Sequence, residues 1–222
     1  QVILSQYGTA AQCAEWIPGL ASGQMIGGFA LSEPDSGSDA KSLTTQAVKV
    51  DGGYRVTGRK FWITHGGIAD IYVLMARTGG NGSGGISAFL LPKDSPGLSF
   101  GKKEEKMGQR SSDTRSVTFH DVHVPKANLV GGKEGDGWLQ AMVAFDRSRP
   151  MLASHALGNA RGAMEEAWRY ANERRTFGKS IFEHQSISFM LADMSTKIEG
   201  ARLLAHKAAH LLDKGERATL AS

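Results

Sequence analysis

The chain has 222 residues, 41% of them hydrophobic and 22% charged, which is the composition of a globular protein with a sizeable core. It contains no run of about 18 apolar residues, so no transmembrane helix is predicted. The net charge is only +4, and basic residues are interspersed with acidic ones, as in KKEEK at 102–106, which argues against a nucleic-acid-binding stripe. The single cysteine, Cys13, excludes an intrachain disulfide.

A short helix is predicted near the start of the chain. Thr9 and Gln12 have the spacing of a capping box, in which each side chain bonds the backbone amide of the other residue. We expect this helix to run to about Ile17 and to stop at Pro18-Gly19, because proline lacks the amide that a helix needs.

Strand patterns follow from Met25 to about Val124. Short or alternating apolar runs are separated by Gly, Asp and Ser, and Asp51-Gly52-Gly53 lies between two such runs as a hairpin turn would. Six or seven strands without long intervening helices indicate an antiparallel β-barrel or sandwich.

From Gly137 the pattern becomes helical, and Pro150 is expected in the first turn of a long helix. A break at 173–185 precedes a last helix, so the fold class is α+β. Apolar residues recur at helical spacing at Leu152, Ala156, Ala160, Ala163, Ala167 and Tyr170, and then at Ile187, Met190, Leu191, Met194, Ile198, Ala201, Ala205, Ala208 and Leu212. We expect these helices to be part of an antiparallel bundle completed by further helices.

Two stretches of the strand region are candidates for ligand binding. ALSEPDSGSDA at 30–40 offers backbone amides and hydroxyls at the end of a strand, where they can bind the edge of a heteroaromatic ring or a phosphate. The alternative is a turn held by its own Ser and Asp side chains. In GRKFWITHGG at 58–67, Trp62 and Thr64 share a strand face and suit a flat polar ring, unless Trp62 is simply a core residue.

The helical region adds two more candidates. Asp146 and Arg149 are neighbours on a helix face, and they form either a local ion pair or a donor and acceptor for a polar ligand. ERRTFGKSIFEHQ at 173–185 carries Arg174 and Arg175, which suit phosphate but are also typical of a solvated turn.

Other common sites are not indicated. No metal-ligand pattern is present, and no GxSxG or GxGxxG motif occurs where catalysis or dinucleotide binding would need it.

Taken together, ALSEPDSGSDAKS, GRKFWITHGG, MGQRSSDTR, FDRSRP and ERRTFGKSIFEHQ resemble the acyl-CoA dehydrogenase family in order and spacing, and most closely its medium- or short-chain straight-acyl type. The resemblance covers essentially the whole chain. It implies the end of an N-terminal helical domain at 1–24, a middle β-barrel domain at 25–130 and the first half of a C-terminal helical-bundle domain at 131–222. The chain is therefore expected to be a fragment of a longer enzyme.

The resemblance also implies a noncovalent FAD site. Ser32 would bond the ring, Trp62 would cover its face and Thr64 would lie near the reactive nitrogen N5, while Arg174 and Thr176 match contacts to the FAD of a neighbouring subunit. The implied cofactor-binding residues are Phe29, Leu31, Ser32, Gly37, Ser38, Trp62, Ile63, Thr64, Arg174, Thr176, Phe177, His184 and Gln185.

For the substrate, Ser38, Asp146 and Arg149 match positions that contact acyl-CoA. The catalytic base of the family is a Glu in a segment beyond residue 222, or in some members the residue before the position of Arg149, which here is Ser148. No catalytic base is therefore expected in this fragment, which alone should be inactive.

The function implied is FAD-dependent α,β-dehydrogenation of an acyl-CoA to the trans-2-enoyl-CoA in fatty acid β-oxidation. An electron-transferring flavoprotein would accept the electrons, and the enzyme would be a homotetramer in the bacterial cytoplasm or the mitochondrial matrix. An acyl-CoA oxidase on the same scaffold and a non-catalytic flavin- or acyl-CoA-binding module remain as alternatives.

Overall fold

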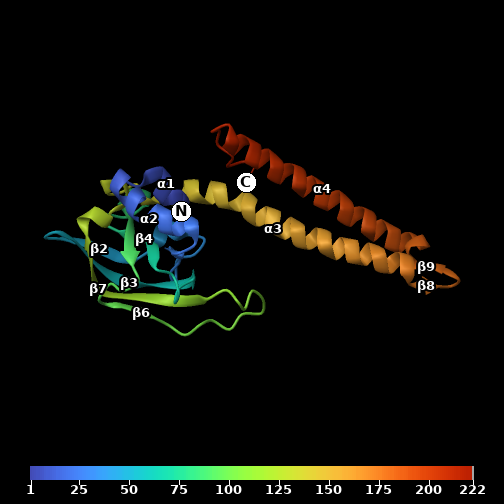
Figure 1. The fold of residues 1–222 in the computed structure, drawn as a ribbon, viewed down its shortest axis with the longest axis horizontal. Helices are drawn as coiled ribbons and strands as arrows, with labels where there is room; N and C mark the ends of the chain where they lie inside the picture. Colours follow the sequence, from blue (N-terminus) through green and yellow to red (C-terminus); the bar gives the residue numbers. More distant parts are fainter. Residues whose placement is uncertain (222) are drawn as a thin grey trace. The chain divides into compact units, whose positions relative to one another are not determined.

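The computed structural model describes residues 1–221, which form two compact units, Gln1–Met142 and a second that starts at Val143. No helix within this described part is long and apolar enough to cross a membrane. The mixture of a curled sheet and long helices confirms the predicted α+β class (Figure 1).

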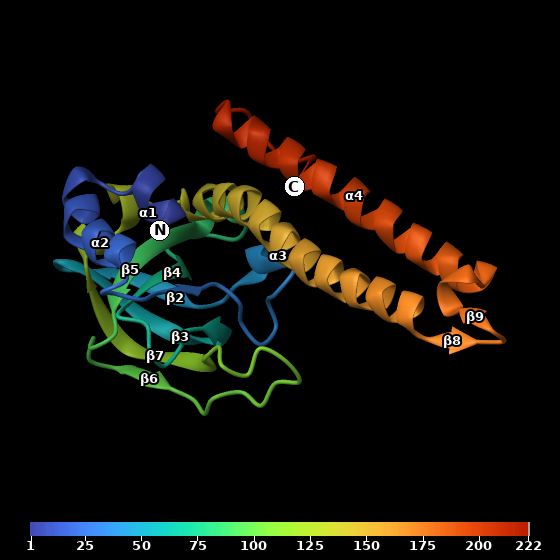
Figure 2. The ribbon, with the colours of Figure 1, turned by 45° about the vertical axis from the view of Figure 1, so that its right-hand side comes forward.

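The first unit is built around a seven-stranded sheet. Its strands are β1 (Gly27–Ala30), β2 (Gln46–Val50), β3 (Gly53–Thr64), β4 (Ile71–Arg77), β5 (Ile86–Pro92), β6 (Leu98–Phe100) and β7 (Thr114–Pro125). The order is β1-β4-β2-β3-β7-β6, with β5 also paired to β4. Most pairs are antiparallel as expected, but β1 runs parallel to β4, and β2 adds one parallel pair to that strand. The sheet is curled (Figure 2).

The predicted hairpin joins β2 to β3. Val50 pairs with Gly53, so Asp51 and Gly52 form the two-residue turn, and Gly52 adopts the φ of +77° that glycine tolerates without a steric penalty. Inward-facing residues of β3 then fill the core. The ring of Tyr54, for example, meets that of Phe89 edge to face, with the ring centroids 4.9 Å apart.

Two short helices, α1 (Val2–Tyr7) and α2 (Ala10–Ser22), precede the sheet. The capping box of Thr9 and Gln12 is confirmed, but the predicted stop at Pro18-Gly19 is wrong. The fixed φ of proline fits a helix, so Pro18 removes one hydrogen bond without ending α2. The helix ends instead at Gly23, whose φ of +77° gives a left-handed cap.

The second unit is a helical pair. Its elements are most of α3 (Gly137–Glu173), the small strands β8 (Arg175–Thr176) and β9 (Lys179–Ser180), and α4 (Gln185–Asp213). Both views show α3 and α4 side by side and antiparallel (Figures 1 and 2). Pro150 lies well inside α3, so its predicted place in the first turn is wrong. The helical pattern already begins at Gly137, and the helix continues past the hydrogen bond that Pro150 removes.

The predicted apolar seams are only partly covered in this unit. On α4 the buried side chains are those of Leu191, Ile198, Ala205 and Ala208. Other apolar side chains of the two helices stay exposed, including Leu152, Tyr170, Met190 and Met194. The remaining elements are single 3₁₀ turns at Ala40–Ser42, Ser83–Gly85, Lys126–Asn128, Val130–Gly132 and Ile181–Glu183.

Candidate functional site

The loop after β1 forms a tight turn that is closed by its own backbone. The Glu33 and Ser36 backbones bond each other in both directions, with N–O distances of 2.8 and 3.2 Å. The Ser36 hydroxyl donates to the Asp39 carbonyl at 2.8 Å. The alternative of a self-stabilised turn is therefore correct for Ser36. It does not account for Ser32, which is half-buried and whose hydroxyl makes no hydrogen bond to another residue among residues 1–221.

The other predicted residues of this loop differ in what they can offer a ligand. Phe29 is half-buried in β1, and the Leu31 side chain is only 6% exposed. Gly37 and Ser38 are exposed, and a Cβ added at Gly37 would meet no atom within 4 Å. The exposed residues and the Ser32 hydroxyl are thus the accessible parts of the loop.

A β-bulge in β3 brings Trp62 to the surface. Lys60 pairs with Val117 and Ile63 with Arg115, so β3 carries one residue more than β7 at this point. Trp62 takes a φ of +55°, a left-handed conformation that costs a non-glycine residue about 1–2 kcal/mol. Residues in sparsely populated conformations cluster at functional sites, which makes this bulge notable.

The bulge decides which side chains of β3 face outward. Trp62 is 59% exposed and Thr64 is exposed too, while Ile63 between them is 2% exposed. Trp62 and Thr64 therefore lie on one face as predicted, and the alternative that Trp62 is a core residue is wrong. The Phe61 ring contacts the indole edge to face at 5.8 Å between centroids, and the Arg59 guanidinium stacks over Phe61 at 4.5 Å.

The loop and the bulge are joined directly. The Phe61 amide donates to the Ser32 carbonyl at 2.8 Å, so the residue next to Trp62 is bonded to the loop residue whose hydroxyl has no partner. The two stretches singled out in the sequence therefore lie at the same place in the first unit. An exposed indole and free hydroxyl groups meet there, and this combination suits a flat ring with polar edges.

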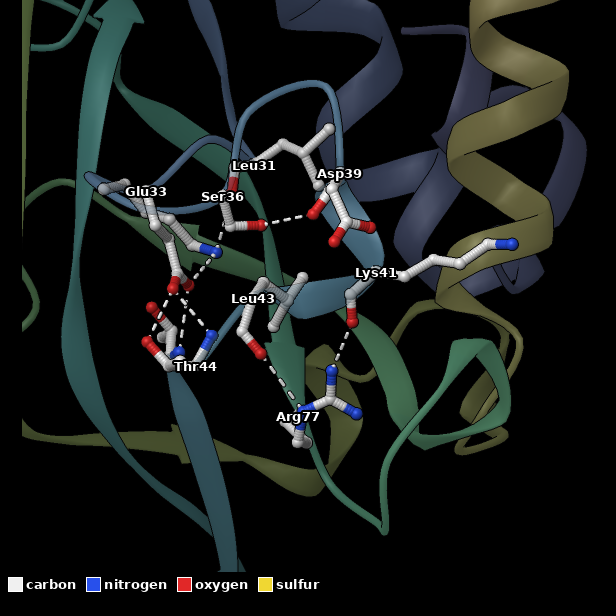
Figure 3. A network of polar contacts seen from close by, with 10 residues as sticks. Leu31, Glu33, Ser36, Asp39, Lys41, Leu43, Thr44 and Arg77 are labelled. Carbon is white, nitrogen blue, oxygen red and sulfur yellow. Dashed lines mark hydrogen bonds and ion pairs between the residues drawn. The ribbon is translucent and has the colours of Figure 1, made fainter.

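Glu33 and Lys60 form a buried ion pair. Figure 3 shows Glu33 among its polar contacts, close to Thr44 and to the loop that carries Leu31 and Ser36. The Lys60 ammonium is 2.8 Å from the Glu33 carboxylate and 2.8 Å from the Leu31 carbonyl oxygen. The same carboxylate accepts from the amide and hydroxyl of Thr44, at 2.6 and 2.7 Å, and from the Thr45 amide at 2.9 Å. Lys60 is fully buried and Glu33 is 3% exposed. One carboxylate thus holds the loop, the segment before β2, and β3 together.

The surroundings shift both pKa values. Burial works to raise the pKa of Glu33, but the charge of Lys60 and hydrogen bonds from Lys60 and the Thr44 backbone lower it to about 2. Burial lowers the pKa of Lys60 to about 8, although Glu33 opposes that shift. Because Glu33 is ionised and fully hydrogen-bonded, it is a poor general base.

Lys60 and Glu33 are not among the site residues predicted from the sequence. A signal was present, because Lys60 falls in the same phase of β3 as the buried residues Tyr54 and Val56. A lysine on the inner face of a strand requires a buried partner. The identity of that partner was not evident, because Glu33 lies 27 positions away in the chain.

In the second unit, Asp146 and Arg149 form the ion pair that was one of the two alternatives. Their side chains are 3.3 Å apart, and the Thr219 hydroxyl also donates to Asp146 at 2.8 Å. Arg149 remains exposed, so the pair leaves donors free for a ligand. Ser148 donates to the Phe145 carbonyl at 3.3 Å, a local helix contact that does not activate a hydroxyl.

The turn between α3 and α4 gathers the remaining predicted residues. Thr176 and His184 are hydrogen-bonded at 3.0 Å, and the His184 ring meets that of Phe177 edge to face at 6.1 Å. Phe177 is 96% exposed with a φ of +51°, and Arg174 and Gln185 are exposed as well. The turn therefore exposes an aromatic ring, that of Phe177, and a cation, that of Arg174, to solvent or to a binding partner.

The chain matches known proteins over nearly all its length. Residues 28–122 match the family described as acyl-CoA dehydrogenase, middle domain, and residues 135–222 match acyl-CoA dehydrogenase, C-terminal domain. An acyl-CoA dehydrogenase of Bacillus subtilis is 48% identical over 210 residues, which cover 94% of this chain and 55% of that protein.

Solved structures agree with this match. Butyryl-CoA dehydrogenase from Megasphaera elsdenii superposes with a TM-score of 0.94 at 43% identity, over 99% of this chain and 57% of that one. PigA with FAD and proline superposes with a TM-score of 0.95 at 30% identity, over 98% and 57%. The chain spans about half the length of these relatives. Two domains of one family, matched in order and at this level of identity, show that the chain belongs to the acyl-CoA dehydrogenase family.

Proposed function

We propose that the protein to which this chain belongs is an FAD-dependent acyl-CoA dehydrogenase. It oxidises the α,β carbon–carbon bond of an acyl-CoA thioester to the trans-2-enoyl-CoA, and an electron-transferring flavoprotein accepts the electrons. The observation that carries the proposal is the exposed Trp62, held on a left-handed bulge and joined through Phe61 to the unpartnered Ser32. Family membership and the FAD held by PigA support it.

The residues of the first unit fit a flavin. The Trp62 indole offers a flat apolar plate for one face of the ring, and the hydroxyls of Ser32 and Thr64 can donate to its polar edge. When bound, FAD accepts the hydride that leaves the β carbon. The residues of this chain hold the ring and shield one face from water.

In the second unit, Arg149 and Asp146 supply a donor and an acceptor for the polar part of acyl-CoA. Ser38, in the first unit, is proposed separately as a contact to the substrate. The α proton must pass to a base as the hydride leaves. Glu33 is committed to Lys60, and among residues 1–221 Ser148 has no partner that would activate it. As membership of the family implies, we propose that the base is a glutamate of the full-length protein in a segment beyond residue 222.

The turn at Phe177 is proposed to contact the FAD of a neighbouring subunit in a homotetramer. The exposed ring of Phe177 and the exposed Arg174 suit an adenine and a phosphate respectively.

The test is the FAD content of the full-length protein and of Trp62→Ala and Trp62→Phe variants. The wild type should purify yellow with about one FAD per chain. Loss of the ring in Trp62→Ala should weaken FAD binding about tenfold, equivalent to about 1.4 kcal/mol, whereas Trp62→Phe should retain most of it because a flat ring remains. Unchanged FAD content and spectrum in Trp62→Ala would contradict this placement.

The acceptor is tested separately. The substrate-reduced flavin of a dehydrogenase should persist in air until an electron-transferring flavoprotein is added. Reoxidation by air within seconds would identify an oxidase on the same scaffold instead.

A further inference from the structure

We infer that the buried Lys60–Glu33 ion pair is a positioning device. It fixes the loop after β1 against the bulge of β3, and so sets the spacing between Ser32 and Trp62 before any flavin binds. The inference rests on the proposed function, because it concerns the surface that would hold the flavin ring. The side chains of Lys60 and Glu33 are 0% and 3% exposed, so they would act on the flavin indirectly, through the positions of Ser32 and Trp62.

The hydrogen bonds of Lys60 and Glu33 hold specific backbone groups in one orientation. Lys60 donates to the Leu31 carbonyl as well as to Glu33, which fixes the backbone at the start of the loop. Both oxygens of Glu33 are occupied, one by Lys60 and the Thr45 amide, and the other by Thr44. Two apolar side chains could fill the same volume, but they could not orient these carbonyl and amide groups.

The device acts close to the candidate surface. Lys60 immediately precedes the bulge, and the amide of the next residue, Phe61, bonds the Ser32 carbonyl. Two consecutive residues of β3 are therefore tied to three consecutive residues of the loop. Any movement of the Lys60 side chain changes the position of the bulge relative to Ser32, although neither Lys60 nor Glu33 reaches the surface.

The full-length protein with both Lys60→Met and Glu33→Met tests this inference. The double change removes both charges together, so no unpaired charge is left buried. We expect a folded protein that binds added FAD at least tenfold more weakly and whose bound flavin has shifted visible absorption bands. Lys49→Met is the matched control, because Lys49 forms an exposed ion pair with Glu134 at 3.4 Å. FAD affinity within twofold of wild type and an unshifted spectrum in the double variant would overturn the inference.

Hydrogen exchange of the flavin-free wild-type protein gives a second, independent test. If the pair orders the loop, the amides of Ser36, Thr44, Thr45 and Phe61 should be protected before FAD is added. If they exchange as fast as the exposed loop at 79–84 until FAD binds, the flavin orders the loop and the inference is wrong. This measurement decides the matter if the double variant does not fold.

The proposed function can fail separately from this inference. A full-length wild-type protein that binds no FAD would refute the flavin site, while protected amides would still show that the loop is ordered without a flavin. Normal FAD binding by both the wild type and the double variant would refute only the positioning role.

Discussion

The candidate residues of the two units are held in place in different ways. In the first unit, Ser32 accepts a backbone hydrogen bond from Phe61, the residue before Trp62, and a buried ion pair lies next to this contact. In the second unit, the side chain of Phe177 is 96% exposed and contacts the ring of His184. The comparison indicates that the first unit carries a preformed surface, whereas the turn of the second unit presents residues suited to contact with another molecule.

Breaking the buried pair should have the largest effect. Lys60→Met leaves the Glu33 carboxylate buried without its partner, which should lower the free energy of unfolding by about 3–5 kcal/mol. The side chain of Lys49 is 72% exposed, so Lys49→Met should change the free energy of unfolding by less than about 0.5 kcal/mol. Urea unfolding of the full-length protein measures both. Equal effects of the two changes would show that burial of the pair has no energetic consequence.

Lowering the pH should remove the stability that the buried pair contributes, with a smaller effect than Lys60→Met. The unfolded chain protonates Glu33 near pH 4.5, whereas the folded chain holds its pKa at about 2, so the unfolded state binds more protons between these values. The stability that Glu33 contributes is present above pH 4.5 and is lost as the pH falls towards 2. In this window the free energy of unfolding of the wild type should fall more steeply than that of Glu33→Gln, by up to about 1.4 kcal/mol per pH unit. Parallel curves for the two proteins would contradict the assigned ionisation.

The smallest effect on stability is expected in the second unit. Phe177 is 96% exposed, so Phe177→Ala should change the free energy of unfolding by no more than about 0.5 kcal/mol. It should nevertheless weaken FAD retention in the assembled protein, because the exposed ring is proposed to contact the cofactor of a neighbour. Thermal unfolding and FAD content measured on one preparation separate the two effects. A large loss of stability with normal FAD retention would show that Phe177 has a structural role.

The sequence predicted those features that depend on neighbouring residues. The turn at Asp51-Gly52 and the capping box at Thr9 and Gln12 each follow from a few adjacent side chains, and both are present. The two prolines were misjudged for a related reason. A proline removes one hydrogen bond, and whether the helix continues depends on packing beyond the local pattern, as at Pro18 and Pro150.

The features that were missed depend on residues far apart in the chain. The bulge that exposes Trp62 arises from the register between β3 and β7, and strict alternation along β3 would have placed Trp62 on the same side as the buried Lys60. The pairing of Lys60 with Glu33 needs the loop and the strand to be adjacent, which no local pattern shows. The motifs therefore located the candidate surface but did not reveal what supports it.

Tryptophan fluorescence during FAD titration tests the central claim most directly. The chain has four tryptophans, so subtracting the emission of a Trp62→Phe variant of the full-length protein from that of the wild type isolates the signal of Trp62. If the flavin ring lies on the indole, this difference signal should be lost as one equivalent of FAD binds, because a stacked flavin quenches it. A Trp62 signal that survives saturation with FAD would place the flavin elsewhere and contradict the account.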